Sequence, residues 1–270
     1  MQLKRWITAI IGCPILIYLI WSGKGWPFYT LLCSAAIVGL FEFYNMTSPG
    51  VPRFVIWANL AITVFIFFVF GWGKPLIDPV ILISLWAIVP MAYYMLFHPT
   101  PDPRRTGDLG RLILGPIYIC LPLAMLIMID MRPNGKLWIL FLLTVVFAND
   151  TGAFYFGRIF GRHKLYEAVS PKKTWEGVYG ALAGVAVWGG LLAWLRPETG
   201  PALLLILLSL LVCAASVVGD LLESLLKRQA GIKDSSNLLP GHGGVLDRID
   251  SLTAVAPVFM LGLLLLGGGK

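Results

Sequence analysis

Long apolar runs, separated by short polar connections, fill most of the chain. A helix needs about 17–25 residues to cross a bilayer, and nine runs reach or approach that length. They cover residues 6–22, 27–46, 53–71, 76–97, 111–130, 136–156, 175–195, 202–226 and 251–267. The pattern predicts an all-α, polytopic integral membrane protein with about nine transmembrane helices.

The composition supports this prediction and excludes a soluble enzyme with a single anchor. Hydrophobic residues make up 58% of the chain and charged residues 13%, whereas a soluble domain has about 45–50% and about 25%. The first run follows Lys4 and Arg5, as in a secretory signal, but no small-residue cleavage site follows Trp21. We therefore expect a retained first helix.

Lysine and arginine are unevenly divided between the two sides that nine spans would create. The side of the amino terminus carries 15 of the 21 basic residues, and the other side carries six. Cytoplasmic loops are enriched in Lys and Arg, so the amino terminus and the two longest polar loops are predicted to be cytoplasmic. The carboxyl terminus is then outside, and the expected location is the inner (plasma) membrane.

The polar residues concentrate in the second part of the chain. Residues 1–110 hold about four spans, whereas residues 111–270 hold about five spans and two long loops, at 149–175 and 227–250. The stretch SPKKTWEG at 170–177 in the first loop reads as a helix start. We therefore expect the catalytic region in residues 111–270.

Four polar residues share one helical face at the end of the eighth run. Asp220, Glu223, Ser224 and Lys227 are spaced i, i+3, i+4 and i+7, which places them on one side of a helix. An internal ion pair between Glu223 and Lys227 is one explanation. Asp220 has no basic residue at i+3 or i+4, and an acid within an apolar helix indicates a functional site.

The stretch LPGHGGVLDRID at 239–250 places charge and bare backbone before the last apolar run. Its glycines let the backbone turn and expose N–H groups that can bind an anion. Asp247 and Asp250 suit the start of a helix, where carboxylates are stabilised, so capping alone is an alternative. Capping leaves His242 and Arg248 unexplained.

Acids, bases and a glycine turn at a cytoplasmic helix end suit a polyanion held through a divalent cation. Mg²⁺ prefers one or two carboxylates, waters and phosphate oxygens, so Asp220 and Asp247 are predicted to clamp it. The sequence contains no G-x-x-x-x-G-K-[ST] loop, no Rossmann glycine fingerprint and no H-E-x-x-H motif. A membrane-specific type of nucleotide site is therefore expected.

The segment from Ser224 to Asp250 resembles the characteristic motif of phosphatidate cytidylyltransferases, also called CDP-diacylglycerol synthases, of the bacterial type. That pattern is S-x-x-K-R, four residues, K-D, a spacer and H-G-G-x-x-D-R-x-D. Its fixed positions are all present, as Ser224, Lys227, Arg228, Lys233, Asp234, His242, Gly243, Gly244, Asp247, Arg248 and Asp250. The stretches at 149–162 and 170–177 also resemble bacterial members.

The resemblance implies a Mg²⁺-dependent nucleotidyl transfer in phospholipid biosynthesis, from CTP to phosphatidic acid, with CDP-diacylglycerol and pyrophosphate as products. It leaves open a second, monovalent cation and a homodimer, and it implies no nucleic acid partner. The implied catalytic residues are Asp220, Asp247, Lys227 and Arg248. The implied metal ligands are Asp220, Asp247 and Glu223. The implied substrate-binding residues are Asp150, Lys172, Lys173, Ser224, Arg228, Lys233, His242, Gly243 and Gly244.

Three other functions fit parts of the pattern. A CTP-dependent lipid kinase of related fold would use a similar site and differs in its products. A secondary transporter would also contain intramembrane acids, but the charges here cluster at one end and no inverted repeat is evident. A CDP-alcohol phosphotransferase would carry a D-G-x-x-A-R pattern, which the sequence lacks.

Overall fold

The structure, a computed structural model, describes residue 12 and residues 14–22, 25–71, 79–97, 100, 102–196, 200–239, 241 and 243–266. The chain divides into two compact units. The first unit comprises Met1–Met131 and Ala230–Ile249, and the second comprises Arg132–Gln229 and Asp250–Lys270.

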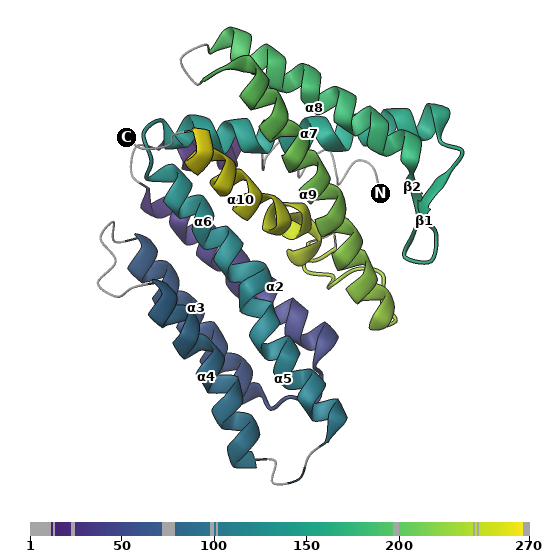
Figure 1. Cartoon of the computed structure of the whole chain (residues 1–270). Helices are drawn as coiled ribbons and strands as arrows, with labels where there is room; N and C mark the ends of the chain where they lie inside the picture. Colours follow the sequence, from purple (N-terminus) through teal and green to yellow (C-terminus); the bar gives the residue numbers. More distant parts are fainter. Residues whose placement is uncertain are drawn as a thin grey trace. The chain divides into compact units, whose positions relative to one another are not determined.

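The first unit is built from helices that run alongside one another (Figure 1), all of them apolar except the first part of α5. In chain order they are α2 (Trp26–Thr47), α3 (Arg53–Gly71), α4 (Pro79–Phe97), α5 (Pro103–Gly115), the π-helical turn η1 (Pro116–Cys120) and α6 (Leu121–Asp130). Large apolar side chains such as Phe65 and Phe68 remain about half exposed. Helices that are apolar on every side are typical of membrane spans.

The two prolines of the fifth apolar run are absorbed within one helical stretch. In η1 the N–H of Leu121 donates to the carbonyl of Pro116, five residues earlier. Pro116 and Pro122 have no N–H to donate, and the wider π turn accommodates the interruption without ending the helix. The run predicted at 111–130 therefore forms a single span that includes α5, η1 and α6.

The second unit contains four long helices and one β-hairpin. Its elements are α7 (Gly135–Phe160), β1 (Lys164–Tyr166), β2 (Ser170–Thr174), α8 (Trp175–Leu195), α9 (Ala202–Gln229) and α10 (Leu246–Leu266), whose first turn belongs to the first unit. The antiparallel strands place Lys164 opposite Thr174 and Tyr166 opposite Ser170. The hairpin projects from one end of the α7–α8 pair (Figure 1).

The all-α, polytopic membrane prediction is confirmed, whereas the predicted number of about nine spans is not. Seven helices of the described chain are long and apolar enough to cross a bilayer: Trp26–Thr47, Arg53–Gly71, Arg105–Asp130, Gly135–Phe160, Trp175–Leu195, Ala202–Gln229 and Leu246–Leu266. Of the first predicted run, residues 6–11 and 13 lie outside the described residues, and residues 14–21 are helical. The fourth run forms α4 with a shorter apolar segment, Trp86–Phe97.

The two long loops are shorter than predicted. α7 continues to Phe160, so residues 149–160 are helical, and α9 continues to Gln229. The stretch at 170–177 contains the predicted helix start, because α8 begins at Trp175, and the residues before it, Ser170–Thr174, form a strand that was not predicted. Thr174 caps this helix, because its hydroxyl accepts the N–H of Gly177.

Candidate functional site

A polar pocket of about 460 Å³ lies in the second unit, between α7, the hairpin, α8 and α9. We call it the hairpin pocket. Four residues that the sequence singled out line it together: Asp150, Lys172, Lys173 and Asp220. Apolar residues, including Ala153, Phe154, Val178 and Val217, complete its wall. With Arg158, three cationic and two carboxylate residues thus share one cavity with an apolar surface.

Asp220 contacts two other residues of the predicted site. Its Oδ2 forms an ion pair with Nζ of Lys173, and its Oδ1 lies 3.4 Å from the hydroxyl of Ser224 one turn later. The side chain of Asp220 is 38% exposed and that of Lys173 is 24% exposed, so both remain accessible from the pocket. The helical spacing correctly predicted that Asp220 and Ser224 share a face.

Glu223 and Lys227 form the ion pair that their i, i+4 spacing predicts. The side chain of Glu223 is fully buried and that of Lys227 is 12% exposed. A buried acid is costly unless a cation compensates it, so this pair supports a structural role in α9. Metal binding by Glu223 and catalysis by Lys227 stay predictions.

Hydrogen bonds connect the hairpin and the residues just before it to α9 and α8. Nε of Arg228 donates to the carbonyl of Val169 in the hairpin turn, at 3.3 Å. Glu176, in the first turn of α8, accepts the backbone N–H groups of Arg162 and His163. These contacts, with the Lys173 ion pair, hold β2 against the pocket.

Small residues bring α7 and α8 close enough to form the pocket. A Cβ added to Gly152 would lie 2.5 Å from the carbonyl oxygen of Gly180, and one added to Gly180 would lie 2.2 Å from Cβ of Phe156. A stripe of small residues allows such close helix contact in membranes. The contact places Asn149, whose Nδ2 donates to Ser216 on α9 at 3.2 Å, at the base of the pocket.

A second polar cluster lies in the first unit, around the start of α10. Oδ2 of Asp247 accepts the backbone N–H of Gly244 at 2.8 Å and that of Ser235 at 2.9 Å. The hydroxyl of Ser235 lies 3.0 Å from the same oxygen. Asp247 therefore holds the turn that precedes α10, through donors that lie before the helix. A metal-binding role for Asp247 stays a prediction.

The glycines of the motif serve the turn that precedes α10. Gly241 and Gly243 have φ values of 80° and 82°, a conformation that side chains disfavour. Leu239 donates its N–H to the carbonyl of Gly243, which closes the turn. The N–H of Gly244 donates to Asp247. Substrate binding by Gly243 and Gly244 stays a prediction.

Glu42 of α2 also belongs to this cluster, although sequence reasoning missed it. Its carboxylate accepts the hydroxyls of Ser235 and Ser236 and the N–H groups of Val245 and Leu246. A lone acid within an apolar run was the available signal, since the chain holds no other acid between residues 1 and 77. The sequence between α9 and α10 is thus attached to the second span.

The remaining motif residues are placed as follows. Lys233, Asp234 and Arg248 are exposed, and Asp250 is partly buried with its Oδ1 accepting the N–H of Ser251 at 2.7 Å. His242 lies outside the described residues. Asp220 belongs to the second unit and Asp247 to the first, so their joint metal binding stays a prediction.

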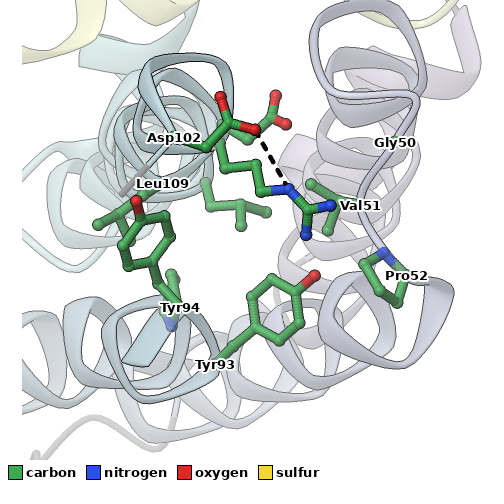
Figure 2. Close-up of a pocket in the computed structure, with 11 residues that line it drawn as sticks. Gly50, Val51, Pro52, Tyr93, Tyr94, Asp102 and Leu109 are labelled. Atoms are coloured by element: carbon green, nitrogen blue, oxygen red, sulfur yellow. Dashed lines mark ion pairs between the residues drawn. The ribbon is translucent and has the colours of Figure 1, made fainter. Parts of the chain in front are cut away.

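Another pocket, of about 320 Å³, lies in the first unit at the ends of α3, α4 and α5 (Figure 2). Arg105 and Asp102, which both line it, form an ion pair at 3.4 Å. Tyr93, which also lines it, packs against the rings of Phe54 and Phe97. Aromatic clusters of this kind are typical of the membrane–water boundary, and none of the predicted site residues lines this pocket.

No three Asp, Glu, His or Cys side chains of the described residues come together as a preformed metal site. Mg²⁺ needs fewer protein ligands, because waters and substrate phosphates complete its shell. Asp150 and Asp220, which both line the hairpin pocket, fit that requirement.

Fold and site together define a polytopic membrane protein with charged pockets at its helix ends. A family model described as the cytidylyltransferase family matches residues 3–266, and the chain belongs to that family. A phosphatidate cytidylyltransferase of Pseudomonas aeruginosa is 38% identical over 261 residues, 95% of this chain and 94% of that protein. One of Bacillus subtilis is 30% identical over 271 residues, 96% and 97% of the two chains. One of Haemophilus influenzae is 48% identical over 134 residues, 47% and 45% of the two chains.

Proposed function

We propose that this protein is a phosphatidate cytidylyltransferase, which converts CTP and phosphatidic acid to CDP-diacylglycerol and pyrophosphate. The observation that carries the proposal is the family membership over residues 3–266. Similarity to phosphatidate cytidylyltransferases over nearly the full length of both chains supports it. So does the hairpin pocket, in which cations and carboxylates lie beside an apolar wall.

Lys172 and Lys173 are the proposed phosphate-binding residues of the hairpin pocket. Both lie on β2 and line the cavity. Anionic oxygens of CTP, or of the phosphatidic acid headgroup, would be attracted to two ammonium groups in a partly enclosed site. From the motif, Arg228, Lys233, His242 and Arg248 are proposed to bind further phosphate oxygens.

A Mg²⁺ ion is proposed to be held by Asp220, with Asp247 as its second ligand as the motif implies. Asp150 is an alternative ligand because it shares the hairpin pocket with Asp220. Bound to the phosphates, Mg²⁺ would neutralise charge on the triphosphate and on the leaving pyrophosphate. Ionised carboxylates facing a cavity are the ligand type that this hard cation prefers.

In the proposed reaction, a phosphate oxygen of phosphatidic acid forms a bond with the α-phosphorus of CTP. The bond from that phosphorus to the bridging oxygen of the β-phosphate breaks, and pyrophosphate leaves with the electron pair. The second pKa of a phosphate monoester is near 6, so the attacking oxygen is already largely deprotonated at neutral pH. The protein therefore needs to orient the reactants and neutralise charge, and it needs no general base.

The proposal also includes nine spans in the inner membrane. The hairpin pocket would then face the cytoplasm. The seven helices that qualify as spans would be joined by α4 and by the first apolar run. The division of basic residues, 15 on one side and six on the other, supports this orientation. CTP in the cytoplasm would then reach Lys172 and Lys173 directly.

The test is pyrophosphate release from CTP when phosphatidic acid is added to the purified protein, with the lipid product identified by mass spectrometry. CDP-diacylglycerol and pyrophosphate are expected in equal amounts. A CTP-dependent lipid kinase would instead produce a phosphorylated lipid and CDP. A transporter would move solute into proteoliposomes without consuming CTP. Either of those results would overturn the proposal.

A further inference from the structure

Glu42 is a charged residue held in the interior of the first unit. Its side chain lies on α2, a predicted span, and the residue is 4% exposed. An ionised acid at such a place is costly unless several donors compensate it. The hydrogen-bond donors around Glu42 therefore identify the part of the chain that its carboxylate stabilises.

All four of these donors come from one segment, 193 to 204 positions further along the chain. Oε2 accepts the hydroxyl of Ser235 at 3.0 Å and the N–H of Leu246 at 2.8 Å. Oε1 accepts the hydroxyl of Ser236 at 2.5 Å and the N–H of Val245 at 3.1 Å. Each carboxylate oxygen thus connects the beginning of the motif segment, residues 234–247, to its end.

The backbones of α2 and the motif segment lie so close together that glycine is needed at their contact. A Cβ added to Gly244 would lie 2.5 Å from Oε2 of Glu42, and one added to Gly39 would lie 3.0 Å from Cδ1 of Ile249. Gly39 and Glu42 are three residues apart and share a face of α2. The start of α10 is therefore packed directly on this face.

Capping of α10 explains only half of these contacts. A carboxylate at a helix N-terminus is stabilised by the free N–H groups there, which accounts for Val245 and Leu246. It does not account for Ser235 and Ser236, which lie ten residues before the helix. Ser235 also contacts Oδ2 of Asp247 through its hydroxyl and its N–H. Glu42 and Asp247 therefore act on the same serine.

We propose that Glu42 is a positioning residue for the reaction, which fixes the motif segment and thereby sets the orientation of Asp247. The structural role of Glu42 does not depend on the proposed function, whereas its expected effect on turnover rests on that function. Without Glu42, Ser235 and Ser236 lose their shared acceptor, and the turn before α10 is free to change shape. Asp247 then spends less time in the arrangement that turnover requires.

The structural part of the proposal is tested by hydrogen exchange in Glu42→Gln, which keeps the size of the side chain and removes its charge. Faster exchange is expected in peptides covering 235–246, with exchange in α8 unchanged. The matched control is Thr47→Val, because the hydroxyl of Thr47 on the same helix donates to the carbonyl of Phe43 within α2. Unchanged exchange at 235–246 in a folded Glu42→Gln protein would overturn the proposal, whether or not the chain transfers cytidylyl groups.

The functional part is tested by the kinetics of the same variants. Because Asp247 spends less time in the orientation that turnover requires, kcat should fall about 10-fold or more in Glu42→Gln. KM for CTP should change less, because Lys172 and Lys173 keep their contacts in the second unit. Thr47→Val should keep both constants. An equal loss in both variants would show a general packing effect and overturn the proposal.

Ser235→Ala provides a second route if Glu42→Gln does not fold. It removes one donor to Glu42 and to Asp247 without placing a new group in the interior. A lower kcat with faster exchange at 236–246 is expected, and wild-type behaviour in both measurements would overturn the proposal. A wild-type chain that releases no pyrophosphate would instead refute the proposed function and leave the exchange result to decide the role of Glu42.

Discussion

Lys173 on the hairpin forms an ion pair with Asp220 on α9. The two residues are 47 positions apart in the sequence, and they meet on the wall of the hairpin pocket. Asp220 was singled out because no basic residue lies at i+3 or i+4, and the base that pairs with it comes from β2. When an anionic substrate and a cation enter, Lys173 and Asp220 can exchange this contact for contacts to phosphate and metal.

Asp220→Asn should lower kcat/KM about 100-fold or more while the protein stays folded, because a charge that acts on the transition state is lost. Lys173→Gln should lower kcat/KM about 10-fold. The double variant should lose less than the two single losses combined, since each single change leaves a charge without its partner. Pyrophosphate release measures all three. Strictly additive losses would mean that the ion pair has no part in the reaction.

Asp247→Asn separates the hydrogen bonds of this residue to the turn before α10 from its charge. The amide oxygen of Asn can still accept the N–H groups of Ser235 and Gly244, so thermal stability in detergent should change little. Turnover should nevertheless fall about 100-fold or more, because a proposed metal ligand loses its charge. Near-normal activity at saturating Mg²⁺ would remove Asp247 from the set of metal ligands.

The spans were predictable because long apolar runs need no information from distant residues. The run at 53–71 corresponds to α3 (Arg53–Gly71), and the run at 175–195 corresponds to α8 (Trp175–Leu195). The hairpin was missed because its strands have only three and five residues, and SPKKT has no alternating apolar pattern. The pattern of apolar residues therefore predicted the helices, but it did not predict the hairpin, which forms part of the pocket wall.

The site was predictable only where its residues are close in sequence. The helical spacing placed Asp220 with Ser224 and Glu223 with Lys227, and the structure confirms both contacts. Glu42 could not be assigned, because its partners lie 193 and 194 residues away. Such contacts depend on how the helices pack against one another, and residue spacing within a single helix carries no information about that packing.

Gly152→Ala should destabilise the α7–α8 contact, because the added Cβ would lie 2.5 Å from the carbonyl oxygen of Gly180. Overpacking of this kind costs about 1–3 kcal/mol, and backbone atoms cannot move aside as a side chain can. The control is Gly190→Ala on α8, where the nearest atom would be 3.6 Å away. Thermal inactivation of the purified protein should occur at lower temperature in Gly152→Ala alone. Equal behaviour of the two variants would contradict the close packing.

Thr174→Ala should weaken the junction between the hairpin and α8. Thr174 is 7% exposed, and its hydroxyl accepts the N–H of Gly177 at 3.2 Å. Removal of such a cap costs about 1 kcal/mol, and Thr174→Ser should restore most of it. Limited proteolysis of residues 161–174 measures the effect, with faster cleavage expected in Thr174→Ala. Equal cleavage of both variants would show that the cap does not hold the hairpin.

Cysteine labelling in intact and permeabilised cells can test on which side of the membrane the motif segment lies. Asn237 is exposed in the motif segment, and Met131 is 42% exposed in the turn between α6 and α7. In a chain whose native cysteines are replaced by alanine, Asn237→Cys should react with a membrane-impermeant maleimide only after permeabilisation. Met131→Cys should react in intact cells, because one span that includes α5 and α6 separates it from the cytoplasmic side. The reverse pattern would invert the proposed orientation, and labelling of both positions from one side would show that the number of spans between them is even.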